Sequence, residues 1–184
     1  GGTIDVESEL GQGSCFEVLI DLRIAEDRKV VLTAQEEIDE PDSNTLKGMR
    51  FLCAEDNELN AEILMELLKI EGAECIICEN GERVLEAFEQ SAPGYYDMIL
   101  MDVQMPVMNG YDATRAIRRS THELAKTIPI IAMTANAFSE DIQYSLAAGM
   151  NAHISKPVDM KTLEKTIRRI KIGGRGTETQ AIEQ

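Results

Sequence analysis

Five short apolar runs divide residues 48–172, and this repeated pattern constrains the fold more than any other feature of the sequence. The runs span residues 50–54, 73–78, 98–101, 128–133 and 152–155. Helical spacing of apolar residues follows each run, as at Leu59, Ile63, Leu67 and Ile70. Strands that alternate with helices predict right-handed crossovers and a parallel sheet with helices on both faces. We therefore expect an α/β fold with a doubly wound five-stranded parallel sheet in the order 2-1-3-4-5.

The composition limits the classes of partner. The chain has 184 residues, which is the length of one domain with an additional segment or of two very small domains, and 43% of them are hydrophobic, which is enough for a core. A formal net charge of −15 argues against nucleic acid or an anionic membrane surface as a direct partner, because both would repel it. We see neither a long apolar segment nor a basic leader, so we expect a cytoplasmic fragment and leave a membrane-anchored parent open.

Cys75 and Cys78 have the C-x-x-C spacing of redox and zinc sites. On a strand, however, residues three apart point to opposite faces of the sheet, so these two thiols could not share a metal or a disulfide. We expect buried, reduced cysteines instead.

Polar side chains follow four of the predicted strands. Glu55 and Asp56 follow the first, Asp102 the third, Thr134 the fourth and Lys156 the fifth. Taken singly, each has a structural interpretation: an acid pair at a helix start, a turn cap, a buried β-branched residue, a loop salt bridge. The carboxyl ends of parallel strands meet at one edge, where such sheets bind their ligands. Three neighbouring carboxylates would repel one another without a cation, and hard oxygen donors favour Mg²⁺ over Zn²⁺.

The chain on either side of residues 48–172 has a different character. Residues 1–23 alternate apolar and polar side chains around a glycine-rich connection, which predicts a β-hairpin. Residues 24–47 lose this periodicity and are rich in acidic residues, which is typical of a solvated linker. A short helix or strand around Val30-Val31-Leu32 is an alternative within this segment. Residues 173–184 are expected to form a disordered tail.

Residues 48–172 resemble the receiver domains of two-component signalling, which have the flavodoxin-like fold. The resemblance rests on Glu55-Asp56-Asn57, Asp102, Met105-Pro106, Asn109-Gly110, Thr134-Ala135 and Lys156-Pro157. It implies that Asp102 accepts a phosphoryl group from a phosphohistidine, with Lys156 compensating charge and Thr134 binding the product. It further implies that Mg²⁺ is held by Asp56, Asp102 and the Gln104 backbone carbonyl, and by Glu55 through water.

Three positions depart from the family pattern or leave it open. Glu55 stands where many receivers have aspartate, and its side chain is longer. His153 occupies the position of an aromatic switch residue, and imidazole is smaller and titrates near neutral pH. The resemblance implies a cis Lys156-Pro157 peptide, while the sequence itself is compatible with either isomer. His122, by contrast, lies in a polar context where we expect solvent exposure.

Residues 1–16 resemble the last two strands of the ATP-binding domain of sensor histidine kinases, including the segment Gly11-Gln12-Gly13-Ser14-Cys15-Phe16. The nucleotide-binding parts lie upstream in that family, so this fragment is not expected to bind ATP. The two resemblances together imply a receiver from the C-terminal part of a hybrid histidine kinase. Its partners would be the kinase core as phosphohistidine donor and a histidine phosphotransfer protein.

Two other functions remain as alternatives. A Mg²⁺-dependent phosphohydrolase would also use an aspartate nucleophile, but usually has a second acid two residues later, where this chain has Gln104. A receiver that binds without being phosphorylated is the third possibility. Whether the fragment counts as an enzyme is left open, since a phosphorylated receiver hydrolyses its own acyl phosphate.

Overall fold

A computed structural model of the chain describes residues 2–9, 11, 13–20, 45–135 and 139–175, which fall into two units. In the first unit, β1 (Gly2–Glu9) and β2 (Gly13–Ile20) form a two-stranded antiparallel sheet, as the alternating sequence predicts. Ile4 pairs with Val18 and Val6 with Phe16, so the hairpin has one apolar face. All four side chains are exposed, each by more than half.

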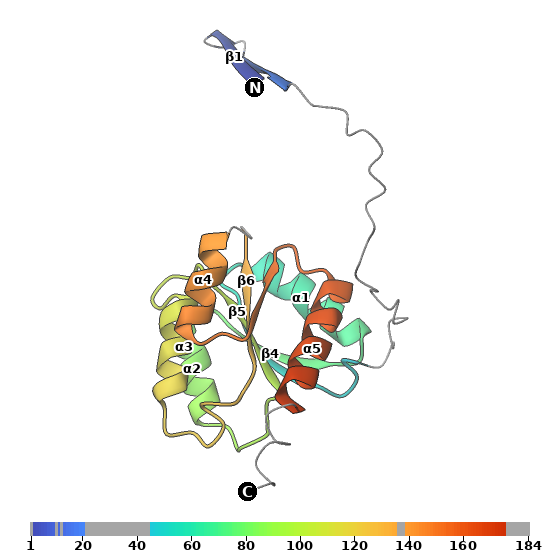
Figure 1. Cartoon of the computed structure of the whole chain (residues 1–184), viewed down its shortest axis with the longest axis vertical. Coiled ribbons are helices and arrows are strands. Elements are labelled where there is room, and N and C mark those ends of the chain that lie inside the picture. Colours follow the sequence, from blue (N-terminus) through green and yellow to red (C-terminus); the bar gives the residue numbers. More distant parts are fainter. Residues whose placement is uncertain (1, 10, 12, 21–44, 136–138, 176–184) are drawn as a thin grey trace, which may run out of the picture. The chain divides into compact units, whose positions relative to one another are not determined.

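The second unit is built on a parallel sheet of five strands (Figure 1). The strands are β3 (Arg50–Ala54), β4 (Glu74–Cys78), β5 (Met98–Asp102), β6 (Ile130–Thr134) and β7 (Ala152–Ser155). Their order in the sheet is β4-β3-β5-β6-β7, which is 2-1-3-4-5 when counted from β3. The predicted doubly wound topology is confirmed.

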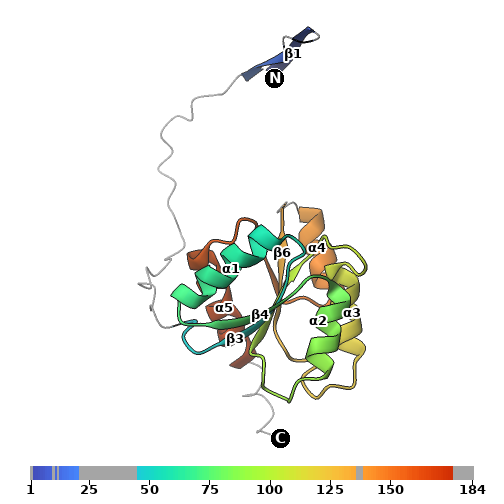
Figure 2. The ribbon, with the colours of Figure 1, turned by 180° about the vertical axis from the view of Figure 1, so that it is seen from behind.

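Five helices of this unit are described: α1 (Glu58–Ile70), α2 (Gly81–Glu89), α3 (Gly110–Arg119), α4 (Ser139–Ala148) and α5 (Met160–Arg175). The first three begin at an asparagine, Asn57, Asn80 or Asn109, whose side chain accepts a backbone N–H of the first turn. Figures 1 and 2 show α1 and α5 on one face of the sheet and α2, α3 and α4 on the other. No helix in the described ranges is long and apolar enough to cross a bilayer.

The two faces of the sheet carry separate cores because neighbouring strand residues point in opposite directions. On β3, Phe51 and Cys53 pack with α1 and α5, while Leu52 and Ala54 pack on the α2–α3 side. Cys75 joins the first core and Cys78 the second, so the C-x-x-C pair is split between faces as predicted. Both thiols are free and only half-buried.

The helical spacing of Leu59, Ile63 and Ile70 indicated that these residues face the sheet, but the structure buries a different side of α1. Leu64 and Leu68 are the buried positions, whereas Leu59, Ile63 and Ile70 are exposed by 64%, 51% and 76%. This helix is apolar on more than one side, so periodicity alone cannot decide which side meets the sheet.

The ends of the unit also differ from the sequence boundaries. Leu46 is only 1% exposed and packs in the core with Phe51, so contact with the domain begins before Gly48. At the other end α5 continues beyond Ile172 to Arg175. The segment around Val30-Val31-Leu32, the rest of residues 21–44, and residues 176–184 lie outside the described residues.

Candidate functional site

The carboxyl edge of the parallel sheet brings the predicted polar residues together. Glu55 and Asp56 directly follow β3, and Asp102 is the last residue of the adjacent strand β5. Ala54 is in register with Met101, so the two strands end at the same level. Lys156 follows β7 and reaches across to both: its Nζ lies 2.5 Å from Glu55 Oε2 and 2.6 Å from Asp102 Oδ2.

Burial makes these ionic contacts strong. The side chains of Glu55 and Asp102 are 3% and 7% exposed, and that of Lys156 is 20% exposed. Charge-assisted hydrogen bonds at such distances are the shorter and stronger kind. Asp56 is exposed and completes the acidic group from the solvent side.

The acidic group fits a divalent cation with oxygen ligands. One oxygen from each of Glu55, Asp56 and Asp102 lies within 4.8 Å of the others, and this is the one such cluster in the described residues. Opposite oxygen ligands of Mg²⁺ are about 4.2 Å apart, so small side-chain adjustments would bring these atoms into coordination range. Three carboxylates and one ammonium carry two formal negative charges in excess, which a divalent ion balances.

Burial, hydrogen bonds and neighbouring charges together shift the pKa values of Asp102 and Lys156. Burial raises the pKa of the Asp102 carboxyl above its ordinary value, and the nearby Glu55 adds to this, against the hydrogen bond and charge of Lys156. Burial alone would lower the pKa of Lys156, but hydrogen bonds to Asp102 and Glu55 and their charges raise it overall. Each group therefore holds a proton more readily than in water.

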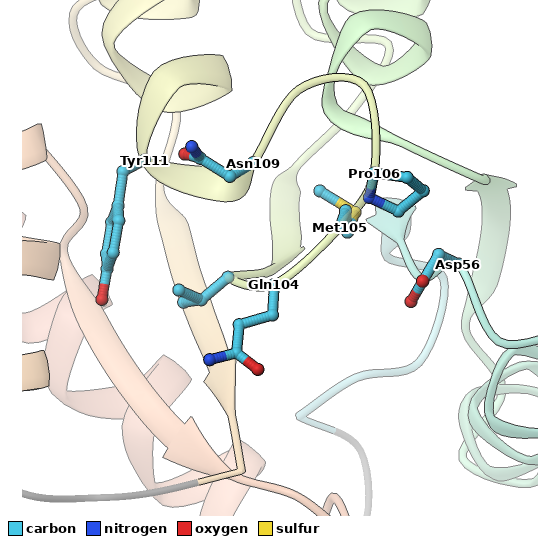
Figure 3. Close-up of a pocket in the computed structure, with 7 residues that line it drawn as sticks. Asp56, Gln104, Met105, Pro106, Asn109 and Tyr111 are labelled. Atoms are coloured by element: carbon cyan, nitrogen blue, oxygen red, sulfur yellow. The ribbon is translucent and has the colours of Figure 1, made fainter.

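The loop after Asp102 is fixed by backbone hydrogen bonds. Gln104 donates its N–H to Asp102 Oδ1 at 3.2 Å, Gly110 donates to the Val103 carbonyl at 3.0 Å, and Gly81 donates to the Met108 carbonyl at 3.1 Å. Beside this loop is an open cleft of about 530 Å³, lined by Asp56, Val103, Gln104, Met105, Pro106, Asn109 and Tyr111. In Figure 3, Gln104 lies between Asp56 and Tyr111.

Val107 is the tip of the same loop, 78% exposed and with a φ of 66°. This left-handed conformation is rare for a β-branched residue and costs free energy. The hydrogen bonds on both sides of Val107 hold the loop in this shape.

Of the remaining candidate residues, Thr134 lies at the same edge and His153 does not. Thr134 ends β6 and is 8% exposed, and its backbone carbonyl accepts the Lys156 backbone N–H at 2.8 Å. The Lys156-Pro157 peptide is cis. His153 lies on β7, half-buried and in register with Ala132, outside the cluster of acids.

Sequence reasoning missed two side chains with specific contacts. Asn60, in the first turn of α1, donates to Glu55 Oε1 at 3.0 Å. Its position five residues after Glu55 on a helix start could have indicated this. Arg118 donates to the Gly149 and Ala125 carbonyls and to Asn151 Oδ1, at 2.9 to 3.0 Å, and ties the end of α3 to two distant loops.

The expected exposure of His122 is wrong. Its Nδ1 accepts the Leu124 N–H, its Nε2 lies 3.1 Å from the Ser91 carbonyl, and its ring packs 4.2 Å from that of Phe88. The polar sequence around His122 hid this tertiary contact with the end of α2.

Comparison with known proteins agrees with this fold and site. The family model for the response regulator receiver domain matches residues 51–168, and the chain belongs to that family. Hybrid signal transduction histidine kinase G of Dictyostelium discoideum is 40% identical over 124 residues, covering 66% of this chain and 4% of that protein. The aerobic respiration control sensor protein ArcB of Escherichia coli is 34% identical over 172 residues, covering 92% of this chain and 20% of ArcB.

Solved structures give the same result. The receiver domain of sensor histidine kinase PA1611 from Pseudomonas aeruginosa has a TM-score of 0.59 and 36% identity, covering 66% of this chain and 96% of that one. That structure has a magnesium ion coordinated in its active site cleft. The predicted kinship with receivers of hybrid histidine kinases is confirmed, and the chain spans only a small part of the full-length relatives.

Proposed function

We propose that Asp102 is the phosphoacceptor of a phosphorelay receiver. The main observation in support is that Lys156 bridges Asp102 and Glu55 at the carboxyl edge of the sheet, where Asp56 also lies. In the reaction, the P–N bond of a donor phosphohistidine breaks and a P–O bond to the Asp102 carboxylate forms. The imidazole leaves with the electron pair of the broken bond. Positioning and charge compensation do most of the work in such transfers.

The residues that would hold Mg²⁺ are Asp56, Asp102 and the Gln104 backbone carbonyl, with Glu55 acting through water. The ion supplies positive charge to the oxygens of the transferring group. Lys156 would compensate a further part of that charge, and the Thr134 hydroxyl would hydrogen-bond a phosphoryl oxygen on Asp102. The magnesium in the PA1611 receiver, which is 36% identical, supports this assignment.

The exposed apolar stripe on α1 is our proposed docking surface for a histidine phosphotransfer protein. Leu59, Ile63 and Ile70 share one side of the helix, and Leu59 lies in the first turn, next to the acidic cluster. A patch of this kind on a soluble domain is a common mark of a protein interface. The receiver of Ssk1, 27% identical with a TM-score of 0.57, has been solved in complex with the phosphotransfer protein Ypd1, which supports the class of partner.

We propose that the hairpin of residues 1–23 is the C-terminal fragment of a kinase ATP-binding domain. Residues 24–47 would be the linker between this fragment and the receiver of a hybrid kinase. The ArcB match supports this, because it covers 92% of the chain and so extends well beyond the receiver match at 51–168. Removal of residues 1–44 is expected to leave the labelling of Asp102 unchanged, since the receiver core begins at Leu46. A large loss of labelling in that truncated chain would contradict this division.

Labelling with acetyl phosphate and Mg²⁺ tests the acceptor assignment. Intact-protein mass spectrometry should show one added phosphoryl group on the wild-type chain and none on Asp102→Asn, with peptide mapping to Asp102. Full labelling of the variant would reject Asp102. Absence of any adduct on the wild type would favour a binding-only receiver, and steady release of inorganic phosphate from small phosphate esters would favour a phosphohydrolase.

The partner surface is tested with phosphorylated Ypd1 as the donor. The variant Ile63→Glu places a charge in the stripe of α1 and should slow transfer from Ypd1 by about tenfold, because docking is impaired. Its labelling by acetyl phosphate should equal that of the wild type. Equal transfer from Ypd1 to both proteins would contradict the docking surface, as would failure of Ypd1 to label a wild-type chain that acetyl phosphate labels.

A further inference from the structure

Glu55 is a buried acid of the site, and its carboxylate is held from two sides. Its side chain is 3% exposed, and each carboxylate oxygen has a partner. Oε2 accepts from Lys156 Nζ at 2.5 Å, and Oε1 accepts from Asn60 Nδ2 at 3.0 Å. Buried carboxylate oxygens need such partners, because water cannot solvate them.

Asn60 is itself fixed by the start of α1. Its backbone N–H donates to the Asn57 side-chain oxygen at 3.1 Å, which is the N-cap contact of the helix. The Asn60 amide therefore extends from a rigid first turn toward Glu55. A continuous set of hydrogen bonds runs from the helix cap through Asn60 and Glu55 to Lys156 and Asp102.

The length of Glu55 gives Asn60 a task that a shorter acid would not require. Glutamate has one more rotatable bond than aspartate, so its carboxylate can occupy more positions for the same backbone. Lys156 contacts Glu55 at Oε2, and a contact at one oxygen leaves the carboxylate able to turn about it. The contact from Asn60 limits Glu55 to the position in which Oε2 faces the centre of the site.

We propose that Asn60 is a positioning residue for cation binding: its amide holds the Glu55 carboxylate in the orientation that completes the Mg²⁺ site. The inference rests on the proposed function of that site. Partners that orient the ligands of a metal typically change its affinity by about tenfold or more when they are removed. The effect of Asn60 should depend on glutamate being present at position 55.

Isothermal titration with Mg²⁺ tests this as a double-mutant cycle. Asn60→Ala should weaken Mg²⁺ binding by about tenfold in the wild-type background and by less than about twofold in the Glu55→Asp background. The unfolding temperature of the metal-free protein should fall by a few degrees, because the buried Glu55 Oε1 loses its partner, so the titration is run at a temperature where circular dichroism shows every variant folded. Gln90→Ala is the matched control, since its amide donates to an exposed glutamate, Glu86, outside the site.

Two results would overturn the proposal: Mg²⁺ binding by Asn60→Ala equal to that of the wild type, or the same loss of affinity in both backgrounds. Either can occur while the wild-type chain binds Mg²⁺ and is labelled on Asp102, in which case the proposed function stands. A wild-type chain that neither binds Mg²⁺ nor accepts label overturns both.

Discussion

Replacing Gly110 by alanine tests how closely α3 must approach Asp102, the proposed phosphoacceptor. A β carbon on Gly110 would overlap the Asp102 carbonyl oxygen and lie 2.9 Å from Met101 Cγ and 3.1 Å from the Asp102 carbonyl carbon. Atoms in contact stay more than about 3 Å apart, so α3 and the end of β5 must separate by about 1 Å. Because Asp102 is part of that strand end, its carboxylate should move as well.

Two effects of different size follow from this displacement. Overpacking of a close contact costs about 2 kcal/mol, which corresponds to a fall of about 8 °C in Tm for a domain of this size. A shift of about 1 Å in a reacting group can reduce the rate by about 100-fold. We therefore expect Gly110→Ala to accept label from acetyl phosphate about 100 times more slowly, measured by mass spectrometry at a temperature where circular dichroism shows the variant folded.

Gly94→Ala is the control for a change in stability without a change at the site. Gly94 has a φ of +78° and no atom within 4 Å of the added β carbon, so the cost is backbone strain of about 1 kcal/mol. Its Tm should fall by about 4 °C while the labelling rate stays unchanged. If folded Gly110→Ala is labelled as fast as the wild type, the close-approach argument is refuted.

Three further perturbations test the charges and one structural contact. Asp102→Asn should gain stability relative to the metal-free wild type as pH rises from about 4 through the raised pKa of Asp102. The reason is that only the wild type must then bury an ionised carboxylate. Thermal unfolding of both proteins from pH 4 to 7 measures the difference in stability. Lys156→Ala should keep weak labelling and lose about 3 kcal/mol of metal-free stability, since two buried carboxylates lose their cation. Mg²⁺ should restore part of this stability, and no rise in Tm on adding Mg²⁺ would count against the argument. Arg118→Ala should lower the free energy of unfolding by about 2 kcal/mol, because three hydrogen bonds are lost. Arg119 is exposed, and Arg119→Ala should lower it by less than about 0.5 kcal/mol. Urea unfolding measures both, and equal losses would contradict the role of the Arg118 hydrogen bonds.

The sequence was sufficient to predict the sheet, its order and the place of the acidic cluster. Apolar runs have the period and length of buried strands, and asparagines mark the starts of α1, α2 and α3. The topology then places Asp102 and Lys156 at one edge, because parallel strands end on the same side. The roles assigned to these residues stay predictions until they are measured.

The sequence could not predict contacts that depend on how helices and loops pack. Leu59 and Leu64 are both apolar residues of α1, and only the packed helix decides that Leu64 is buried. His122 contacts Ser91 and Phe88, which are remote in sequence, and its polar neighbours give no sign of them.

Local periodicity and strand-end chemistry, which the sequence carries by itself, determined the fold and the position of the acidic edge. Tertiary packing alone decided which side of α1 is exposed, which amide holds Glu55, and how closely Gly110 approaches Asp102. The physical reason is the range of the interactions. Hydrophobic periods and helix caps act over a few residues, whereas a side-chain hydrogen bond or a close backbone contact requires its partners to be placed by the whole domain.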